Sequence, residues 1–196
     1  MIPPRWQGEL LQIQISPRKG AEIVTLDVAD VFVGGISGDR FESGAGRKAG
    51  KAAVPEKAVT LIAAEAFEVI ESEFGAKLRH EDTRRNLLTR GVPLNDLIGC
   101  RFQVGDAILE GVELSDPCRY LEGMSGQPMR QYLDNRGGLR ARVVRPGKIP
   151  REIRSCRPTA DEEADRLGDA DVTARRQLGG VIAPDLRRTL GSHLHV

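Results

Sequence analysis

Short segments in which apolar and polar residues alternate recur along this chain, and they constrain its fold more than any other feature. The first runs through residues 10–15, and residues 22–28 and 30–33 continue it with β-branched side chains. Alternation with a period of two places apolar side chains on one face of a strand, and β-branched residues favour extended backbone. These segments therefore predict strands.

Residues 63–74 instead repeat apolar side chains at helical spacing, and Gly75 directly after them is a natural helix end. A short helix is predicted around 129–133. Many short strands at close spacing are typical of a curled antiparallel or mixed sheet. The predicted fold class is mixed α/β, mainly β, with a barrel-like sheet and a few short helices. Its further strands are predicted at 59–62, 86–89, 101–104, 107–114 and 139–144.

The length of 196 residues fits one domain of ordinary size with an appendage, and we assign residues 1–156 to that domain. Between Gly34 and Lys57 the chain is rich in Gly, Lys and Arg and poor in apolar residues, which predicts a long exposed loop. Residues 157–196 contain an acidic and then an arginine-rich run. They predict a tail that is partly helical or flexible, either solvated or in contact with a second copy in a homodimer.

Composition argues against several classes of function. A net charge of +1 and an aromatic content of 4% do not favour nucleic-acid binding. No apolar run approaches the roughly 18 residues of a membrane span, and residues 1–6 do not resemble a secretory signal. The three cysteines form no Cys-x-x-Cys pair. We therefore expect a cytoplasmic protein that binds neither nucleic acid nor membrane.

Cys118 is the first candidate for chemistry. It follows the strand predicted to end at Leu114, and Pro117 stiffens the chain before it. A nearby cation such as Arg119 would favour the thiolate, which is a nucleophile and a soft metal ligand. The alternative for Cys118 is an ordinary buried cysteine, and this is the favoured interpretation of Cys100 and Cys156.

Two groups of cations are candidates for binding an anion. The glycine-rich loop combines free backbone N–H groups with basic side chains, although it has no nucleotide-binding fingerprint; a solvated loop is the alternative. Arg84, Arg85 and Asn86 combine guanidinium forks with an amide, and a surface salt-bridge cluster is the alternative there. The basic residues of the loop are Arg40, Arg47, Lys48, Lys51 and Lys57.

Taken together, these segments resemble the MOSC family, named for the C-terminal domain of molybdenum cofactor sulfurases. The resemblance covers roughly residues 8–150, and its specificity comes from the order of the motifs. Residue 41, often histidine in small members, is Phe41, and Ser115-Asp116 replaces the basic residue often found before Pro-Cys. The matching stretches are Gly34–Arg40, Val59–Ile62 with the following helix, Arg85–Val92, Leu97–Ala107, Pro117–Leu121 and Gly137–Val144.

The resemblance implies a β-barrel-like domain that binds molybdenum cofactor, which is molybdopterin with molybdenum. Cys118 would be the catalytic residue, either as the thiolate on the metal or as the carrier of a transferable sulfur. Arg119 and the glycine-loop cations Arg40, Arg47, Lys48, Lys51 and Lys57 would join Arg84, Arg85 and Asn86 in holding the phosphate and the pterin edge.

Three functions follow from the resemblance. The first is an oxidoreductase that reduces N-hydroxylated substrates with electrons from a separate flavin or iron–sulfur protein, because this sequence has no motif for either group. The second is a sulfur carrier, in which Cys118 takes a persulfide from a pyridoxal-phosphate-dependent cysteine desulfurase. The third is a domain that binds a cofactor or another anionic ligand without turnover.

Overall fold

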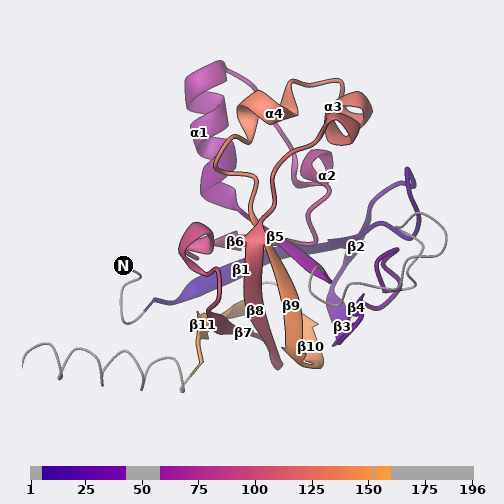
Figure 1. Cartoon of the computed structure of the whole chain (residues 1–196), viewed down its shortest axis with the longest axis vertical. Helices are drawn as coiled ribbons and strands as arrows, with labels where there is room; N and C mark the ends of the chain where they lie inside the picture. Colours follow the sequence, from indigo (N-terminus) through magenta and orange to yellow (C-terminus); the bar gives the residue numbers. More distant parts are fainter. Residues whose placement is uncertain (1–5, 43–57, 152, 160–196) are drawn as a thin grey trace, which may run out of the picture.

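Seven strands close into a barrel in the computed structural model, which describes residues 6–42, 58–151 and 153–159. The strand order is β11-β7-β8-β9-β5-β6-β1, and β1 pairs with β11 to close the ring, while β2 pairs with β1 outside it. This confirms the predicted barrel-like, mainly β fold (Figure 1). The strands are β1 (Gly8–Ile15), β2 (Val24–Leu26), β5 (Val59–Ala63), β6 (Leu87–Arg90), β7 (Arg101–Val104), β8 (Ala107–Leu114), β9 (Leu139–Arg145) and β11 (Ile153–Pro158).

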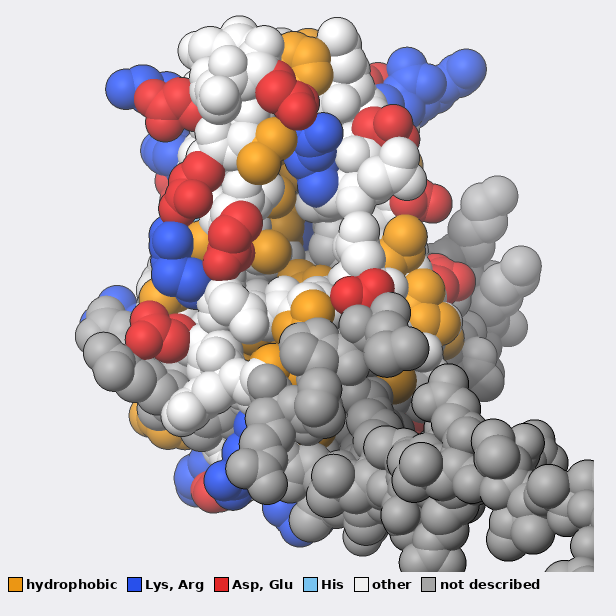
Figure 2. Space-filling view, turned by 90° about the vertical axis from the view of Figure 1, so that its left-hand side faces the viewer, with side chains coloured by type: hydrophobic (Ala, Val, Ile, Leu, Met, Phe, Trp, Pro, Cys, Tyr) orange, Lys and Arg blue, Asp and Glu red, His pale blue; other side chains and the backbone are white. Residues whose placement is uncertain are grey.

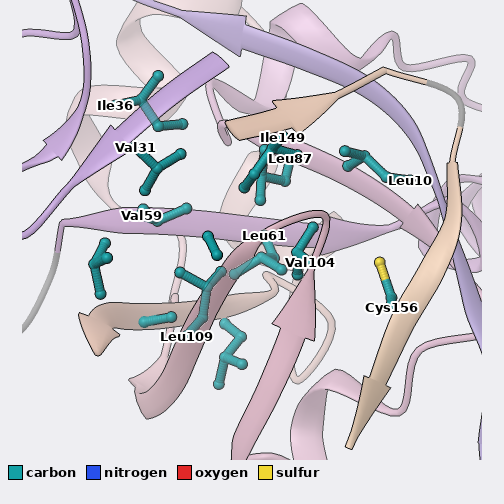
Figure 3. Close-up of a cluster of buried hydrophobic side chains, with 14 of the residues drawn as sticks. Leu10, Val31, Ile36, Val59, Leu61, Leu87, Val104, Leu109, Ile149 and Cys156 are labelled. Atoms are coloured by element: carbon teal, nitrogen blue, oxygen red, sulfur yellow. The ribbon is translucent and has the colours of Figure 1, made fainter. Parts of the chain in front are cut away.

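A second sheet of three strands lies beside the barrel, in the order β10-β3-β4. Its strands are β3 (Val28–Phe32), β4 (Gly35–Ile36) and β10 (Gly147–Pro150). Val31, Ile36 and Ile149 of this sheet are buried in the same core as Leu61 and Leu109 of the barrel (Figure 3). The small sheet and the barrel therefore share one hydrophobic core.

The helices gather at one end of the barrel, at the top of Figure 1. They are α1 (Ala64–Phe74), α2 (His80–Thr83), α3 (Arg119–Ser125) and α4 (Met129–Tyr132). Strands β5 and β6 are parallel, and parallel neighbours need a crossover connection, which α1 and α2 provide. Helix α1 ends as predicted, because Gly75 adopts the left-handed conformation and its N–H bonds to the carbonyl of Glu71.

A second apolar cluster joins this helical layer to the barrel. Ile62 of β5 packs with Ile70 of α1, and the other buried members come from α1 and the 121–133 region: Ala66, Leu121, Met129 and Leu133. The helical end is therefore packed against the barrel and offers a fixed surface for side chains. No helix within residues 6–42, 58–151 and 153–159 is long and apolar enough to cross a membrane.

Strands β10 and β11 were not predicted, and β11 continues to Pro158, past the predicted domain boundary at residue 156. These segments are rich in Arg, Pro and polar residues, so their side chains lack the alternation that marks other strands. Their pairing uses backbone groups that almost any residue supplies. Strand β11, which closes the barrel, was not predicted because it is defined by its backbone pairing with β1 and β7 and not by a pattern in its own residues.

Candidate functional site

Five stretches of chain that are far apart in sequence converge at the helical end of the barrel. Hydrogen bonds join the segment 16–21 to 38–41 and 84–86, and join 84–86 to 115–120 and 137–140. Cys118 lies on these stretches together with five of the predicted cofactor-binding residues, namely Arg40, Arg84, Arg85, Asn86 and Arg119. The fold therefore brings together the two motifs that the sequence singled out.

Asn86 uses its whole side-chain amide inside the protein. Its Oδ1 accepts from Thr60 N at 3.0 Å and from Thr60 Oγ1 at 2.8 Å. Its Nδ2 donates to Gln14 O at 3.2 Å and to Asp39 Oδ2 at 3.3 Å. An amide in such a network has no free donor or acceptor for a ligand, so in this structure Asn86 ties β1, β5 and the loop at Asp39 together.

Arg85 is also buried, with 8% of its surface exposed. Its Nε donates to Gly137 O at 2.9 Å, its Nη2 to Ser115 O at 2.6 Å and its Nη1 to Thr83 O at 3.5 Å. Burial, helped by the like charge of Arg140, lowers the pKa of Arg85 to about 10. The group stays cationic at neutral pH, and its donors bind backbone rather than pointing outward.

Arg84 is half-buried and its hydrogen bonding is incomplete. Its Nη2 donates to Ser16 Oγ and, at 3.0 Å, to Ala21 O, while its buried Nε has no partner among the described residues. Burial and, next, the charge of Arg40 lower the pKa of Arg84. Two like charges that repel each other, one with an unused donor, would both gain from an anion between them.

The surroundings of Arg84 add a further cation and room for a ligand. Lys19 Nζ lies 4.9 Å from the centroid of the Tyr120 ring, and Tyr120 interacts electrostatically with Arg84. A polar cavity of about 540 Å³ is lined by Arg84 and Arg79, by Ser125 of α3, and also by the carboxylates of Glu22, Glu81 and Asp82. A second, largely apolar cavity of about 410 Å³ lies on the face with α1 that Figure 2 shows, and no predicted site residue lines it.

Cys118 is exposed and directly precedes α3, as its N-cap residue. Its position beyond the end of β8 at Leu114 is as predicted. Its electrostatic interaction with Arg85 partly offsets the effect of burial on the pKa of that guanidinium. Arg119 is exposed, and its charge acts on Glu122, where it helps to lower the carboxyl pKa after the larger contributions of Arg130. Among the described residues, Arg85 is thus a cation on which Cys118 acts electrostatically.

Four predicted cofactor-binding residues, Arg47, Lys48, Lys51 and Lys57, lie outside the described residues. Arg40 is described: its guanidinium lies over the Phe41 ring at 4.8 Å, and its backbone N–H donates to Ser16 O at 3.0 Å. Sequence reasoning did not single out Lys19, Tyr120 or Arg140. Tyr120 and Arg140 lie in stretches that resemble the family, but no pattern there assigns them a role, because their places beside Arg84 and Arg85 depend on segments that are far apart in the chain.

The other two cysteines differ from Cys118 in exposure. Cys100 is half-buried, and its Sγ lies 3.8 Å from Asp96 O. Cys156 is fully buried in the barrel core, where burial raises the pKa of its thiol to about 12 (Figure 3). The interpretation of Cys156 as a packing residue agrees with this.

Alkylation of the folded protein by iodoacetamide is therefore expected to modify Cys118 first and Cys156 last, because access and thiolate content set the rate. Peptide mass mapping at successive times measures the order. Modification of Cys156 ahead of Cys118 would contradict the assigned exposures.

His80 lies beneath the site, 5% exposed, and neither ring nitrogen has a hydrogen-bond partner among the described residues. Burial lowers its pKa from 6.5 to about 4, and the nearby backbone of Arg85 opposes this only in part. Between these two values the unfolded chain binds the proton more tightly than the folded one. Stability is therefore lost as pH falls through this window, by up to about 3 kcal/mol.

In the variant His80→Phe, which keeps a ring in place and removes the titrating group, this part of the acid sensitivity is expected to disappear. Urea unfolding from neutral pH to about pH 4 measures it in both proteins. Parallel loss of stability in the two would show that His80 is not the group responsible.

The donor set limits what kind of ligand fits. No group of three or more His, Cys, Asp or Glu side chains suited to hold a metal occurs among residues 6–42, 58–151 and 153–159. A soft thiol and several cations instead suit an anionic ligand that itself supplies most of the donor atoms to its metal. The residues present therefore fit a molybdenum–dithiolene cofactor better than a bare metal ion.

Comparisons with known proteins agree with the fold. YuaD of Bacillus subtilis is 21% identical, with a TM-score of 0.64 over 76% of this chain and 93% of that one. YiiM of Geobacillus stearothermophilus is 15% identical, with a TM-score of 0.58 over 88% and 91% of the two chains. YiiM of Escherichia coli is 18% identical, with a TM-score of 0.51 over 96% and 100%. Likeness at such low identity establishes the fold alone.

No curated protein matches the sequence. A family model described as MOSC domain, however, matches residues 36–153, which is more than half of the chain. The match includes the Gly-Asp-Arg loop, the Arg-Arg-Asn turn and Cys118. This chain therefore belongs to the MOSC domain family.

Proposed function

We propose that this protein binds the molybdenum cofactor through Cys118 and reduces N-hydroxylated substrates, with electrons from a separate flavin or iron–sulfur protein. The MOSC family is associated with binding of this cofactor. The observation that carries the proposal is the position of Cys118: its thiol is exposed at the end of the barrel where Arg84, Arg85 and Arg40 converge.

Each group has a distinct role in this proposal. The thiolate of Cys118 is the soft ligand of the metal. Arg84 and Arg40, with Lys19 beside Tyr120, hold the anionic end of the cofactor, because Arg84 keeps an unpartnered buried donor and lies close enough to Arg40 for the two charges to repel. Arg85 and Asn86 hold the backbone that carries these groups. When bound, the cofactor supplies two-electron chemistry that protein side chains lack.

The test is to produce the protein in a host that makes the cofactor and to measure molybdenum and pterin on the freshly purified protein. We expect about one equivalent of molybdenum and of pterin per protein chain. We also expect the protein to reduce N-hydroxy compounds when a chemical reductant supplies the electrons. Cofactor at full content without activity on any N-hydroxy compound would reject the oxidoreductase. Absence of both molybdenum and pterin would reject cofactor binding itself.

The exposure of Cys118 also favours a second candidate, a sulfur carrier. A desulfurase persulfide would pass its outer sulfur to the Cys118 thiolate: the new S–S bond forms as the donor's S–S bond breaks, and the donor leaves as its thiolate. Incubation with a cysteine desulfurase and cysteine would add the mass of one sulfur atom to the peptide with Cys118. An unchanged intact mass would exclude this function.

A further inference from the structure

We infer that Arg85 is a positioning residue that fixes the backbone carrying Cys118, rather than a residue that contacts the bound ligand. The inference rests on the proposed function only in taking Cys118 as the functional thiol. Its basis is that all three nitrogens of the buried guanidinium donate to main-chain carbonyls.

Two of these carbonyls belong to segments that Arg85 holds against each other. Ser115 O comes from the residue after β8, and Gly137 O from the loop before β9. Ser115 N also donates to Gly138 O, at 2.7 Å. A Cβ on Gly137 would lie 2.4 Å from Ser115 O, so the approach of the two backbones requires glycine. We call Arg85, Ser115, Gly137 and Gly138 the carbonyl clamp.

The carbonyl clamp reaches Cys118 through a short and stiff connection. Only Asp116 and Pro117 separate Cys118 from Ser115, and the proline ring fixes its own backbone φ. On the other side, the carbonyl of Cys118 accepts from Leu121 N at 3.0 Å and begins α3. The thiol is therefore held between the clamp and the first turn of a helix, which presents it in one place.

The chemistry of arginine explains why this residue type is needed. Its planar fork spans carbonyls that lie apart, whereas an ammonium is a single point. Asp116 and Cys118 oppose the effect of burial on the pKa of Arg85 only in part, and no carboxylate among the described residues lies within salt-bridge distance of its guanidinium. Burying such a charge is costly, and the geometry it imposes on the Cys118 segment is the compensating gain.

The experiment measures the position of Cys118 without using cofactor or activity. A nitroxide is attached to Cys118 in the Cys100→Ser background, and the variants Arg85→Lys and Arg85→Met are compared by electron paramagnetic resonance. Amide hydrogen exchange at Ser115 and in the barrel core is measured on the same proteins without the label. The matched control is Arg140→Met, because Arg140 is a neighbouring cation whose Nε pairs with Glu113 at 3.3 Å.

In Arg85→Lys and Arg85→Met we expect a more mobile nitroxide and exchange at Ser115 that is faster by about tenfold, the effect of losing one charged hydrogen bond. Exchange in the barrel core is expected to stay unchanged in Arg85→Lys, and Arg140→Met is expected to resemble the parent protein in both measurements. If Arg85→Met does not fold, Arg85→Lys alone is compared with the parent protein.

The inference would be overturned if folded Arg85→Lys showed the same nitroxide line shape and the same Ser115 exchange rate as the parent protein. A positive charge at residue 85 would then be enough to hold the Cys118 segment, without the arginine fork. Equal acceleration of exchange throughout the core would overturn it too, since Arg85 would then serve general stability. Failure of the proposed function is seen separately, as missing molybdenum in the parent protein.

Discussion

The variant Cys118→Ser is expected to lose molybdenum, with at least about 100-fold weaker retention than the parent protein. A serine hydroxyl stays protonated at neutral pH and is a hard donor, whereas the metal prefers a soft thiolate. The fold is expected to tolerate the change, because Cys118 is exposed and its side chain makes no capping hydrogen bond to α3. Elemental analysis for molybdenum, normalised to protein, is the measurement.

Cys100→Ser is the matched control for this prediction. It makes the same chemical change at a half-buried cysteine that lies outside the converging stretches, and it is expected to retain full molybdenum content. Thermal melting of both variants separates ligand loss from unfolding. Retention of molybdenum by folded Cys118→Ser would exclude Cys118 as a metal ligand, whatever the other residues do.

The second large effect is expected for Gly138→Ala, which should destabilise the fold by about 4 kcal/mol or more. Gly138 has φ +96, a conformation that L side chains rarely adopt, and a Cβ there would lie 1.9 Å from Leu61 O. That oxygen belongs to β5, which cannot yield without disturbing the barrel. Because Gly138 O also accepts from Ser115 N, the variant should disturb the Cys118 segment as well. Urea denaturation measures the loss.

Gly126→Ala isolates the contribution of the backbone conformation alone. Gly126 also has a positive φ, +66, but a Cβ there would meet nothing within 4 Å. We expect a cost of about 1 kcal/mol, which is the ordinary penalty of the left-handed conformation for a residue with a side chain. Equal destabilisation in the two variants would show that the contact with Leu61 O is unimportant.

The fold could be predicted where a strand buries one face. In β8 the buried residues Ala107, Leu109 and Gly111 alternate with partly exposed ones, so period two was visible in the sequence. Helix α1 was visible through its apolar spacing and Gly75. The short helix α3 was not predicted, because a helix of this length has little periodicity of its own and depends on the packing of Leu121.

The candidate site could be predicted in its residues but not in their roles. The motifs identified the Arg-Arg-Asn turn and Cys118. Arg85 and Asn86 were expected to contact the ligand, but their side chains form hydrogen bonds with other groups of the protein. Adjacency in sequence suggested Arg119 as the cation for the thiol. In the structure, Cys118 acts electrostatically on Arg85, which lies 33 residues earlier in the chain, and Arg119 acts on Glu122.

The strand-rich pattern, the helix that ends at Gly75, the family motifs and the candidacy of Cys118 all follow from the amino-acid sequence alone. These follow from properties of near neighbours: alternation of side chains, backbone freedom of glycine and the order of short motifs. Two features become visible only in the folded chain: β11 closes the barrel, and the two arginines differ, because Arg85 is buried against carbonyls whereas Arg84 keeps an unused donor. That difference depends on which distant backbone groups each guanidinium reaches, and no local pattern contains that information.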